Sequence, residues 1–198
     1  MNDVFYSLAG EGMRAGCSSV FLRLARCNLR CDGRVVGQAY QPVCDTEFES
    51  HRSMTADEIV AAVREAGGSC DWVVLTGGEP GLQMDPALVG RLRAEGYKLA
   101  VETNGTVDLS GLELDWVCVS PKVAEHAIKQ RQADEVKYVR GYGQGVPRTV
   151  VTAKHYLISP AFHGGVLDRR TLDWCVRLCK DNPPWRLSVQ VHPLLGIP

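Results

Sequence analysis

Short runs of apolar and β-branched residues alternate along the chain with stretches whose apolar residues recur every three or four positions. Runs of the first kind predict strands, and stretches of the second kind predict helices. The expected strands span residues 19–25, 72–76, 98–102, 116–120, 135–139, 155–159 and 186–190. This alternation is typical of an α/β fold with a parallel sheet.

Three helices are expected between these strands. The first follows Thr55 and Glu58, which have the spacing of a capping box, and contains the segment IVAAVREAG. The second runs over 85–96 and the third over 168–180, whereas 141–145 reads as a loop. The face of the third helix that we expect to be buried consists of Leu172, Cys175, Val176 and Cys179.

Polar residues and glycines follow most of the predicted strands, in the motifs TGGEP, ETNG, SPK, LISP and QVH. The carboxyl ends of parallel strands share one face of a barrel or open sheet, which is where barrel enzymes hold their chemistry. Loops are polar in any case, but several strand ends here combine glycines with carboxylates. We therefore expect a functional site at this face.

The composition is that of an ordinary globular protein, and the length suits a single domain over residues 1–198. A formal net charge of -1 argues against a general nucleic-acid or anionic-membrane binder. No charged leader is evident, and no apolar run approaches the roughly 20 residues that a membrane span needs. We expect a cytoplasmic protein with a small or site-specific ligand.

Three of the eight cysteines lie close together in the sequence: Cys27, Cys31 and Cys44. Disulfides are not expected in a cytoplasmic chain of this size. Three thiolates can hold an iron-sulfur cluster and leave one iron open to a further ligand. Structural zinc, with His51 recruited as a ligand, and unrelated buried cysteines remain alternatives. We interpret the other five as small hydrophobic residues, namely Cys17, Cys70, Cys118, Cys175 and Cys179.

These cysteines resemble the cluster loop of the radical S-adenosylmethionine superfamily, which has the spacing Cys-x3-Cys-x2-Cys. Cys27 and Cys31 keep the first spacing, and Cys44 resembles the third cysteine displaced by an insertion of about ten residues. The motifs SLAGEG, FLRLARCNLRC, CDT, TGGEP, ETNG, SPK and QVHPLLGIP occur in the order found in the 7-carboxy-7-deazaguanine synthases. The resemblance covers essentially the whole chain and implies an α/β fold, a partial (β/α) TIM-like barrel of about six parallel strands.

The resemblance also implies a reaction. Members of this family are lyases of queuosine and other deazapurine biosynthesis that convert 6-carboxy-5,6,7,8-tetrahydropterin to 7-carboxy-7-deazaguanine. A radical formed from S-adenosylmethionine abstracts hydrogen from C6, and ring contraction with loss of ammonia follows. The implied cofactors are a 4Fe-4S cluster, S-adenosylmethionine and Mg2+. The implied partners are an electron donor such as flavodoxin or ferredoxin and a second copy of the chain in a homodimer.

Residue by residue, the resemblance implies that Cys27, Cys31 and Cys44 bind the cluster and that Thr46 binds Mg2+. Glu79 would accept from the ammonium group of S-adenosylmethionine. The remaining residues expected at this cofactor are Val43, Gly77, Gly78, Ser120, Pro121, Lys122, Ser159, Pro160, Ala161 and Phe162. Val43 offers only aliphatic contact where many relatives have an aromatic residue.

On the substrate side, Arg23 would pair with the carboxylate, Glu102 would take part in the reaction, and the carboxylate at Pro198 would accept the N–H groups of the pterin edge. The other residues expected here are Leu8, Ala9, Gly10, Glu11, Thr76 and His192. Ala9 replaces a usual Gln and Pro193 a common Lys, so both side-chain contacts would be lost.

Three alternative functions stay open. One is another radical S-adenosylmethionine enzyme, such as a radical activase, which would not turn over the carboxypterin. Another is a non-enzymatic zinc or iron-sulfur module, which would not cleave the cofactor. A generic α/β domain with incidental cysteines would stay colourless after anaerobic reconstitution.

Overall fold

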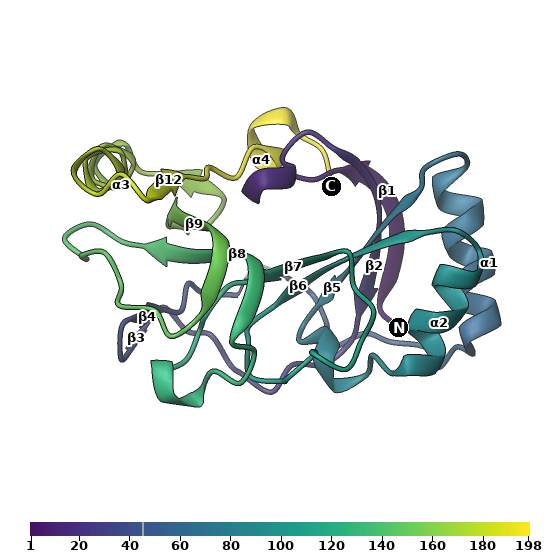
Figure 1. Ribbon diagram of the computed structural model, residues 1–198. Helices are drawn as coiled ribbons and strands as arrows, with labels where there is room; N and C mark the ends of the chain where they lie inside the picture. Colours follow the sequence, from purple (N-terminus) through teal and green to yellow (C-terminus); the bar gives the residue numbers. More distant parts are fainter. Residues whose placement is uncertain (45) are drawn as a thin grey trace.

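The computed structural model describes residues 1–44 and 46–198. Its main feature is an eight-stranded sheet in which β1 pairs antiparallel with β2 and the remaining neighbours are parallel (Figure 1). The order across the sheet is β1 (Asp3–Leu8), β2 (Ser18–Leu24), β5 (Trp72–Gly77), β6 (Lys98–Thr103), β7 (Trp116–Val119), β8 (Gln132–Arg140), β9 (Thr152–Pro160) and β12 (Trp185–Leu187). The sheet is open, with β1 and β12 at its edges, which is the partial barrel that the resemblance implied.

All seven predicted strands are present. The sequence analysis missed β1, because both faces of DVFYSL carry apolar side chains and no regular alternation marks it. β12 ends at Leu187 rather than at residue 190. The next residue, Ser188, still donates its N–H to the Ile158 carbonyl of β9 at 2.9 Å, and its hydroxyl accepts from the Gly12 N–H at 2.8 Å.

The predicted helices begin at the residues that cap them. α1 (Ala56–Gly67) has the Thr55 and Glu58 capping box, and Asp85 caps α2 (Pro86–Ala94) through the N–H of Leu88. α3 (Arg169–Asp181) begins after Asp168, and a short α4 (His192–Leu195) lies near the C-terminus. The expected buried face of α3 was wrong at Val176, which is exposed, because the face turns toward Thr171 and Cys175. In Figure 1, α1 and α2 lie side by side beyond β2, and α3 lies at the opposite end beside β12.

Alternation along the strands separates the core from the site. In β2, β5 and β6 the side chains of Leu22, Leu75 and Val101 pack in the same apolar core as α1 and α2. The residues between them point to the opposite face, where Phe21, Val74 and Ala100 form a smaller cluster. Successive side chains of a strand point to opposite faces. The polar residues two positions after Phe21, Val74 and Ala100 therefore lie side by side on this inner face.

One row of inner residues crosses five strands. Arg23 of β2 is the partner of Thr76 of β5, and the β5–β6 register places Thr76 beside Glu102. Glu102 pairs in turn with Cys118 of β7, and Cys118 pairs with Glu135 of β8. The parallel register therefore brings together residues from distant parts of the sequence.

Two small hairpins and three short 3-10 helices lie in the connections: β3 (Val35–Val36) with β4 (Ala39–Tyr40), β10 (Phe162–His163) with β11 (Val166–Leu167), and η1 (Gly12–Arg14), η2 (Pro80–Leu82) and η3 (Glu125–Ala127). β3 and β4 form the insertion between Cys31 and Cys44. The amide of Gln38 fastens this hairpin to the backbone of Arg148, donating at 3.2 Å and accepting at 2.9 Å. Within the described part of the chain, none of the helices has the length and apolarity needed to cross a membrane.

Candidate active site

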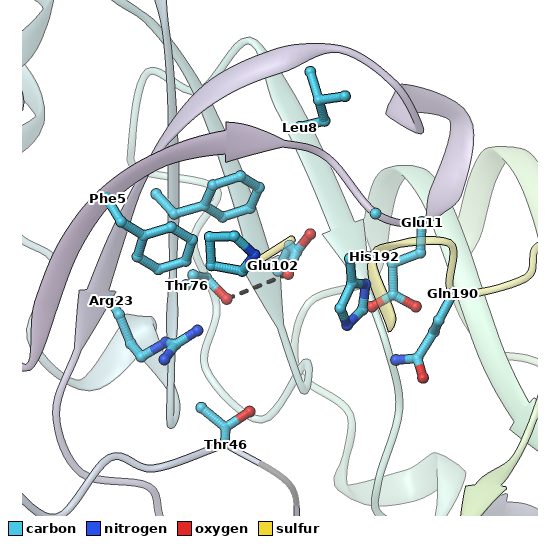
Figure 2. Close-up of a pocket in the computed structure, with 12 residues that line it drawn as sticks. Phe5, Leu8, Glu11, Arg23, Thr46, Thr76, Glu102, Gln190 and His192 are labelled. Atoms are coloured by element: carbon cyan, nitrogen blue, oxygen red, sulfur yellow. Dashed lines mark hydrogen bonds between the residues drawn. The ribbon is translucent and has the colours of Figure 1, made fainter. Parts of the chain in front are cut away.

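A cavity of about 360 Å³, here called the Arg23 cavity, opens on the inner face of the sheet between β1, β2 and the C-terminal segment (Figure 2). Figure 2 shows Arg23 and Thr76 on one side of it, with Glu11, Gln190 and His192 on the other. The residues that line it are Phe5, Leu8, Gly10, Glu11, Phe21, Arg23, Thr46, Thr76, Glu102, Gln190, His192 and Pro198. Eight of the nine residues expected at the substrate thus lie around one space, and Ala9 does not.

Arg23 is the main cationic group of this cavity. Its Nε is buried and has no hydrogen-bond partner among the described residues. Its guanidinium lies 5.1 Å from the centre of the Phe5 ring, which stacks on Phe21 with ring centres 5.2 Å apart and planes 8° from parallel. A buried donor without a partner is costly, and a carboxylate bound in the cavity would satisfy it. The adjacent aromatic rings offer a flat apolar wall for a planar ligand.

The C-terminal segment closes the opposite side of the cavity. The Val191 N–H donates to the Gly10 carbonyl at 2.8 Å, and the Ser7 hydroxyl donates to the Pro198 oxygen at 2.9 Å. Figure 1 shows the C-terminus and α4 beside the end of β1. These bonds place the first and last segments of the chain around one ligand space.

Two carboxylates line the Arg23 cavity, and a lysine outside it pairs with one of them. The Thr76 hydroxyl donates to Glu102 at 3.2 Å, and Nζ of Lys137 lies 2.7 Å from Oε2 of Glu11. Burial raises the pKa of Glu102, and the nearby Glu11 carboxylate adds to this shift. Burial acts in the same sense on Glu11, but the Lys137 ammonium outweighs it, so that the pKa of Glu11 is lowered. The two carboxylates consequently differ in the ease with which they hold a proton.

A second cavity, of about 190 Å³ and here called the cysteine cavity, adjoins the first and shares Glu11, Thr46, Thr76 and Glu102 with it. Cys27, Cys31 and Cys44 all line it. The insertion therefore does not separate Cys44 from the other two, because its N–H donates to the Cys31 carbonyl at 3.3 Å.

The donors around the thiols fit a thiolate-bound cluster. The Leu29 N–H donates to Cys27 Sγ at 3.4 Å, and the Asn104 amide lies 4.0 Å from the same sulfur. Hydrogen bonds of this kind to cluster sulfurs tune iron-sulfur centres. Burial raises the pKa of Cys27 and Cys31, so cluster binding would release protons. In the described residues no three Cys, His, Asp or Glu side chains already stand as a metal site, so a cluster would draw the thiols together.

The third cavity, of about 530 Å³ and here called the Val43 cavity, continues from the cysteine cavity toward β9 and β10. Its lining includes six of the residues expected at the cofactor, namely Val43, Ser120, Lys122, Ser159, Pro160 and Phe162. Nζ of Lys122 donates to the Ser120 hydroxyl at 2.7 Å, and burial lowers the pKa of Lys122 to about 8, with Lys137 adding to the shift. Pro121 and Ala161 are buried beside this cavity without lining it.

Comparison with known proteins gives one consistent result. The chain is 39% identical to a 7-carboxy-7-deazaguanine synthase of Burkholderia multivorans and 37% identical to one of Caulobacter vibrioides, in each case over 100% of this chain and 98% of the relative. A similar protein of Bacteroides thetaiotaomicron is 38% identical over 100% of this chain and 97% of its own length. The chain belongs to the 7-carboxy-7-deazaguanine synthase family. No protein-family model matches the chain.

The fold agrees with this assignment to the 7-carboxy-7-deazaguanine synthase family. The structure superposes on the crystal structure of QueE from Escherichia coli with a TM-score of 0.67, covering 96% of this chain and 92% of that one at 22% identity. At this identity the likeness bears on the fold alone.

Glu79 stands apart from the three cavities, and its expected contact with the cofactor stays a prediction. We expected it at the cofactor, but it is fully buried and lines none of the cavities described above. Its carboxylate accepts from the Thr103 hydroxyl at 2.7 Å, the Asn104 N–H at 2.8 Å and the Gly81 N–H at 2.9 Å. Glu79 therefore holds the ends of β5 and β6 together.

The two glycines before Glu79 allow a close approach of two backbone segments. Gly77 and Gly78 both line the cysteine cavity. A Cβ on Gly77 would collide with the backbone of Leu24, and one on Gly78 would collide with Arg26 and come within 2.9 Å of Cys27 Cβ. The close approach that requires glycine is thus between this turn and the start of the cysteine loop.

Two further predicted positions need correction or restriction. Ala9 is buried in the cluster with Phe21 and Val74, its N–H and C=O bond to Cys17 and Gly16, and it does not line the Arg23 cavity. Thr46 lines both the Arg23 and the cysteine cavity, but Asp45 of the CDT motif lies outside the described residues. His51, the alternative zinc ligand, lines neither cavity; its ring nitrogen contacts the Glu49 carbonyl at 2.9 Å.

Several residues of the site were not predicted: Phe5, Phe21, Asn104, Lys137 and Gln190. Asn104 and Gln190 stand at strand ends that the sequence analysis had noted, so position alone would have found them. The signal for Lys137 was a lysine inside the apolar strand VKYV. Phe5 and Phe21 face each other only through the β1–β2 register.

Proposed function

We propose that this protein converts 6-carboxy-5,6,7,8-tetrahydropterin to 7-carboxy-7-deazaguanine with loss of ammonia, in queuosine or another deazapurine pathway. Arg23 carries the proposal, because its buried Nε, which has no hydrogen-bond partner in the described part of the chain, belongs to a cavity walled by Phe5 and Phe21. Membership of the 7-carboxy-7-deazaguanine synthase family supports the same reaction. The whole chain acts as one radical S-adenosylmethionine domain.

In this proposal each cavity binds one component. Arg23 pairs with the substrate carboxylate, and Glu11, Thr76, Glu102, His192 and the Pro198 oxygen surround the pterin ring. Cys27, Cys31 and Cys44 hold a 4Fe-4S cluster, while Ser120, Lys122 and the Ser159 to Phe162 segment border S-adenosylmethionine. The bound cluster and S-adenosylmethionine would supply the radical that abstracts hydrogen from C6.

We also propose a metal ion, an electron donor, an oligomeric state and a location in the cell. Thr46 stands between the Arg23 and cysteine cavities, which suits a Mg2+ ion that touches substrate oxygens. A flavodoxin or ferredoxin reduces the cluster, the chain works as a homodimer, and the reaction takes place in the cytoplasm.

The test is anaerobic reconstitution with iron and sulfide, followed by a product assay with dithionite, S-adenosylmethionine, Mg2+ and the carboxypterin. We expect 7-carboxy-7-deazaguanine as the product. Cys27→Ala, Cys31→Ala and Cys44→Ala should each lose cluster iron and turnover, whereas Cys17→Ala, at an exposed thiol outside the cavities, should keep both. Cleavage of S-adenosylmethionine without this product would favour another radical enzyme, such as an activase. Iron or zinc binding without any cleavage would favour a non-enzymatic module.

Arg23→Met tests the substrate assignment itself. Removing a charge-assisted hydrogen bond costs about 1.5 to 3 kcal/mol, which corresponds to a rise in KM of roughly tenfold or more. Arg23→Lys should recover part of the loss, because it restores the charge without the fork of donors. Unchanged KM in Arg23→Met would contradict the proposed pairing with the carboxylate.

A further inference from the structure

Lys137 stands where the three cavities meet. It lies on the inner face of β8 with 5% of its surface exposed, and it lines both the cysteine and the Val43 cavity. Its partner Glu11 lines these two and the Arg23 cavity as well. The 2.7 Å ion pair between them therefore borders the cysteine and Val43 cavities directly and the Arg23 cavity through Glu11.

Several titratable groups face this ion pair from the surrounding elements. Glu102 comes from β6, Cys118 from β7, Lys122 from the loop after β7, and His192 from α4, while Glu135 lies two residues before Lys137 on β8. Within the described residues, Glu11 is the carboxylate in ion-pair contact with Lys137. Although burial opposes it, the Glu11 carboxylate is the main cause of the raised pKa of Lys137.

The stability of the folded protein does not by itself explain a buried ion pair at this position. Replacing a buried ion pair by apolar residues of similar volume is often neutral or stabilising, because desolvation offsets the attraction between the charges. Apolar residues fill the outer face of β8, where Val136 and Tyr138 pack in a core cluster. A charged pair kept on the inner face, at the junction of three cavities, points to a task in ligand binding.

We propose that Lys137 is a positioning residue of the substrate site, whose ammonium group fixes the Glu11 carboxylate as an ionised hydrogen-bond acceptor for the pterin ring. The inference rests on the proposed function, since it takes the occupant of the Arg23 cavity to be the carboxypterin. Lys137 acts through Glu11, because it does not itself line that cavity.

The ion pair also makes the Glu11 and Glu102 carboxylates differ in protonation. Glu11 stays ionised beside Lys137, while Glu102, which bonds to the Thr76 hydroxyl, holds a proton more readily. Neighbouring carboxylates whose environments push their pKa values apart are suited to different roles. An acceptor for ring N–H groups and a group able to exchange a proton then stand in one cavity.

The experiment compares Lys137→Met and Lys137→Arg with a matched control, Lys154→Met. Lys154 pairs with Asp134 at the same 2.7 Å, on the neighbouring strands β9 and β8, but its side chain is 72% exposed. Binding of 6-carboxy-5,6,7,8-tetrahydropterin is measured by anaerobic equilibrium dialysis from acidic to basic pH, with iron content and melting temperature determined in parallel.

We expect Lys137→Met to bind the carboxypterin on the order of tenfold more weakly at neutral pH. Without its cation, Glu11 would take up a proton at higher pH, so the fall in affinity on the acid side should begin at higher pH than in the wild type. Lys137→Arg should keep most of the affinity, and Lys154→Met should match the wild type. Iron content should be the same in all four proteins.

A loss of affinity in Lys137→Met that is equal at every pH would indicate a merely structural role and overturn the inference, as would unchanged binding. If Lys137→Met does not fold, Glu11→Gln is measured instead. The inference requires that Glu11→Gln binds the carboxypterin more weakly than the wild type and lacks the part of the pH dependence that comes from Glu11. Wild-type affinity in Glu11→Gln would overturn the inference. A wild-type protein that fails to turn over the carboxypterin would instead contradict the proposed function. Turnover by the wild type together with normal binding by Lys137→Met would contradict only the role of Lys137.

Discussion

The imidazole of His192 packs directly on Gly10, so closely that a Cβ on Gly10 would lie 2.9 Å from His192 Cβ and would overlap the ring. Residues from opposite ends of the chain thus form one wall of the Arg23 cavity. Glycine is needed at position 10 because of this contact, not because of its backbone conformation.

Gly10→Ala should therefore displace His192 and raise the KM for the carboxypterin by about tenfold or more, because small misplacements of a binding group are costly. Steady-state kinetics measures the effect. Gly90→Ala is the control: Gly90 lies within α2 with open space around it, so alanine should raise stability by about 0.5 to 1 kcal/mol without changing KM. An equal KM in both variants would contradict the proposed role of the contact.

Glu79→Gln should lower the free energy of unfolding by about 1 to 3 kcal/mol, because three donors converge on the carboxylate and an amide cannot accept from all of them. Urea denaturation measures the change. Glu113→Gln, at a side chain that is 83% exposed, should stay within about 0.5 kcal/mol of the wild type. Normal stability of Glu79→Gln with weakened S-adenosylmethionine binding would restore the role that the sequence had predicted.

Glu102 should make the stability of the protein depend on pH. Its pKa is raised in the folded state, chiefly by burial, so between the unfolded and the folded pKa the folded protein binds more protons than the unfolded chain. Stability should then fall as pH rises through this window. Glu102→Gln removes this contribution, so its stability relative to the wild type should increase with pH across the window and level off above it. Urea titrations at a series of pH values would contradict this if the difference between the two proteins were constant or had the opposite sign.

Residues added after Pro198 should weaken carboxypterin binding and leave the cluster intact. The Pro198 oxygen is held by the Ser7 hydroxyl at the Arg23 cavity, and Pro198 does not line the cysteine cavity. Ser7→Ala should weaken binding in the same direction without adding bulk, and Ser18→Ala, at an exposed position on β2, should not. Equilibrium dialysis and iron analysis separate the two effects. Normal affinity in both the extended protein and Ser7→Ala would exclude a role for the terminal oxygen.

Local patterns predicted most of the architecture because they depend on neighbouring residues. The capping box at Thr55 and Glu58, the Asp85 cap and the apolar runs of seven strands all act over a few positions, and each element formed. The edge strand β1 was missed because antiparallel pairing with β2 defines it more than its own sequence does.

Some features of the candidate site could likewise be predicted from local motifs, and others could not. Strand-end motifs were sufficient to nominate Thr76, Glu102 and Ser120, since parallel strands deliver their carboxyl ends to one face. The burial of Glu79 could not be predicted, because its three donors come from two separate strand ends.

The sequence by itself determined most of the elements, the family and the residue types available for chemistry, because each of these depends on short motifs. Tertiary structure decided which of those residues share a cavity. Register placed Arg23 beside Thr76, the return of the C-terminal segment brought His192 onto Gly10, and the fold paired Lys137 with Glu11. These relationships join residues far apart in the chain, and they arise only when the strands assemble into the sheet.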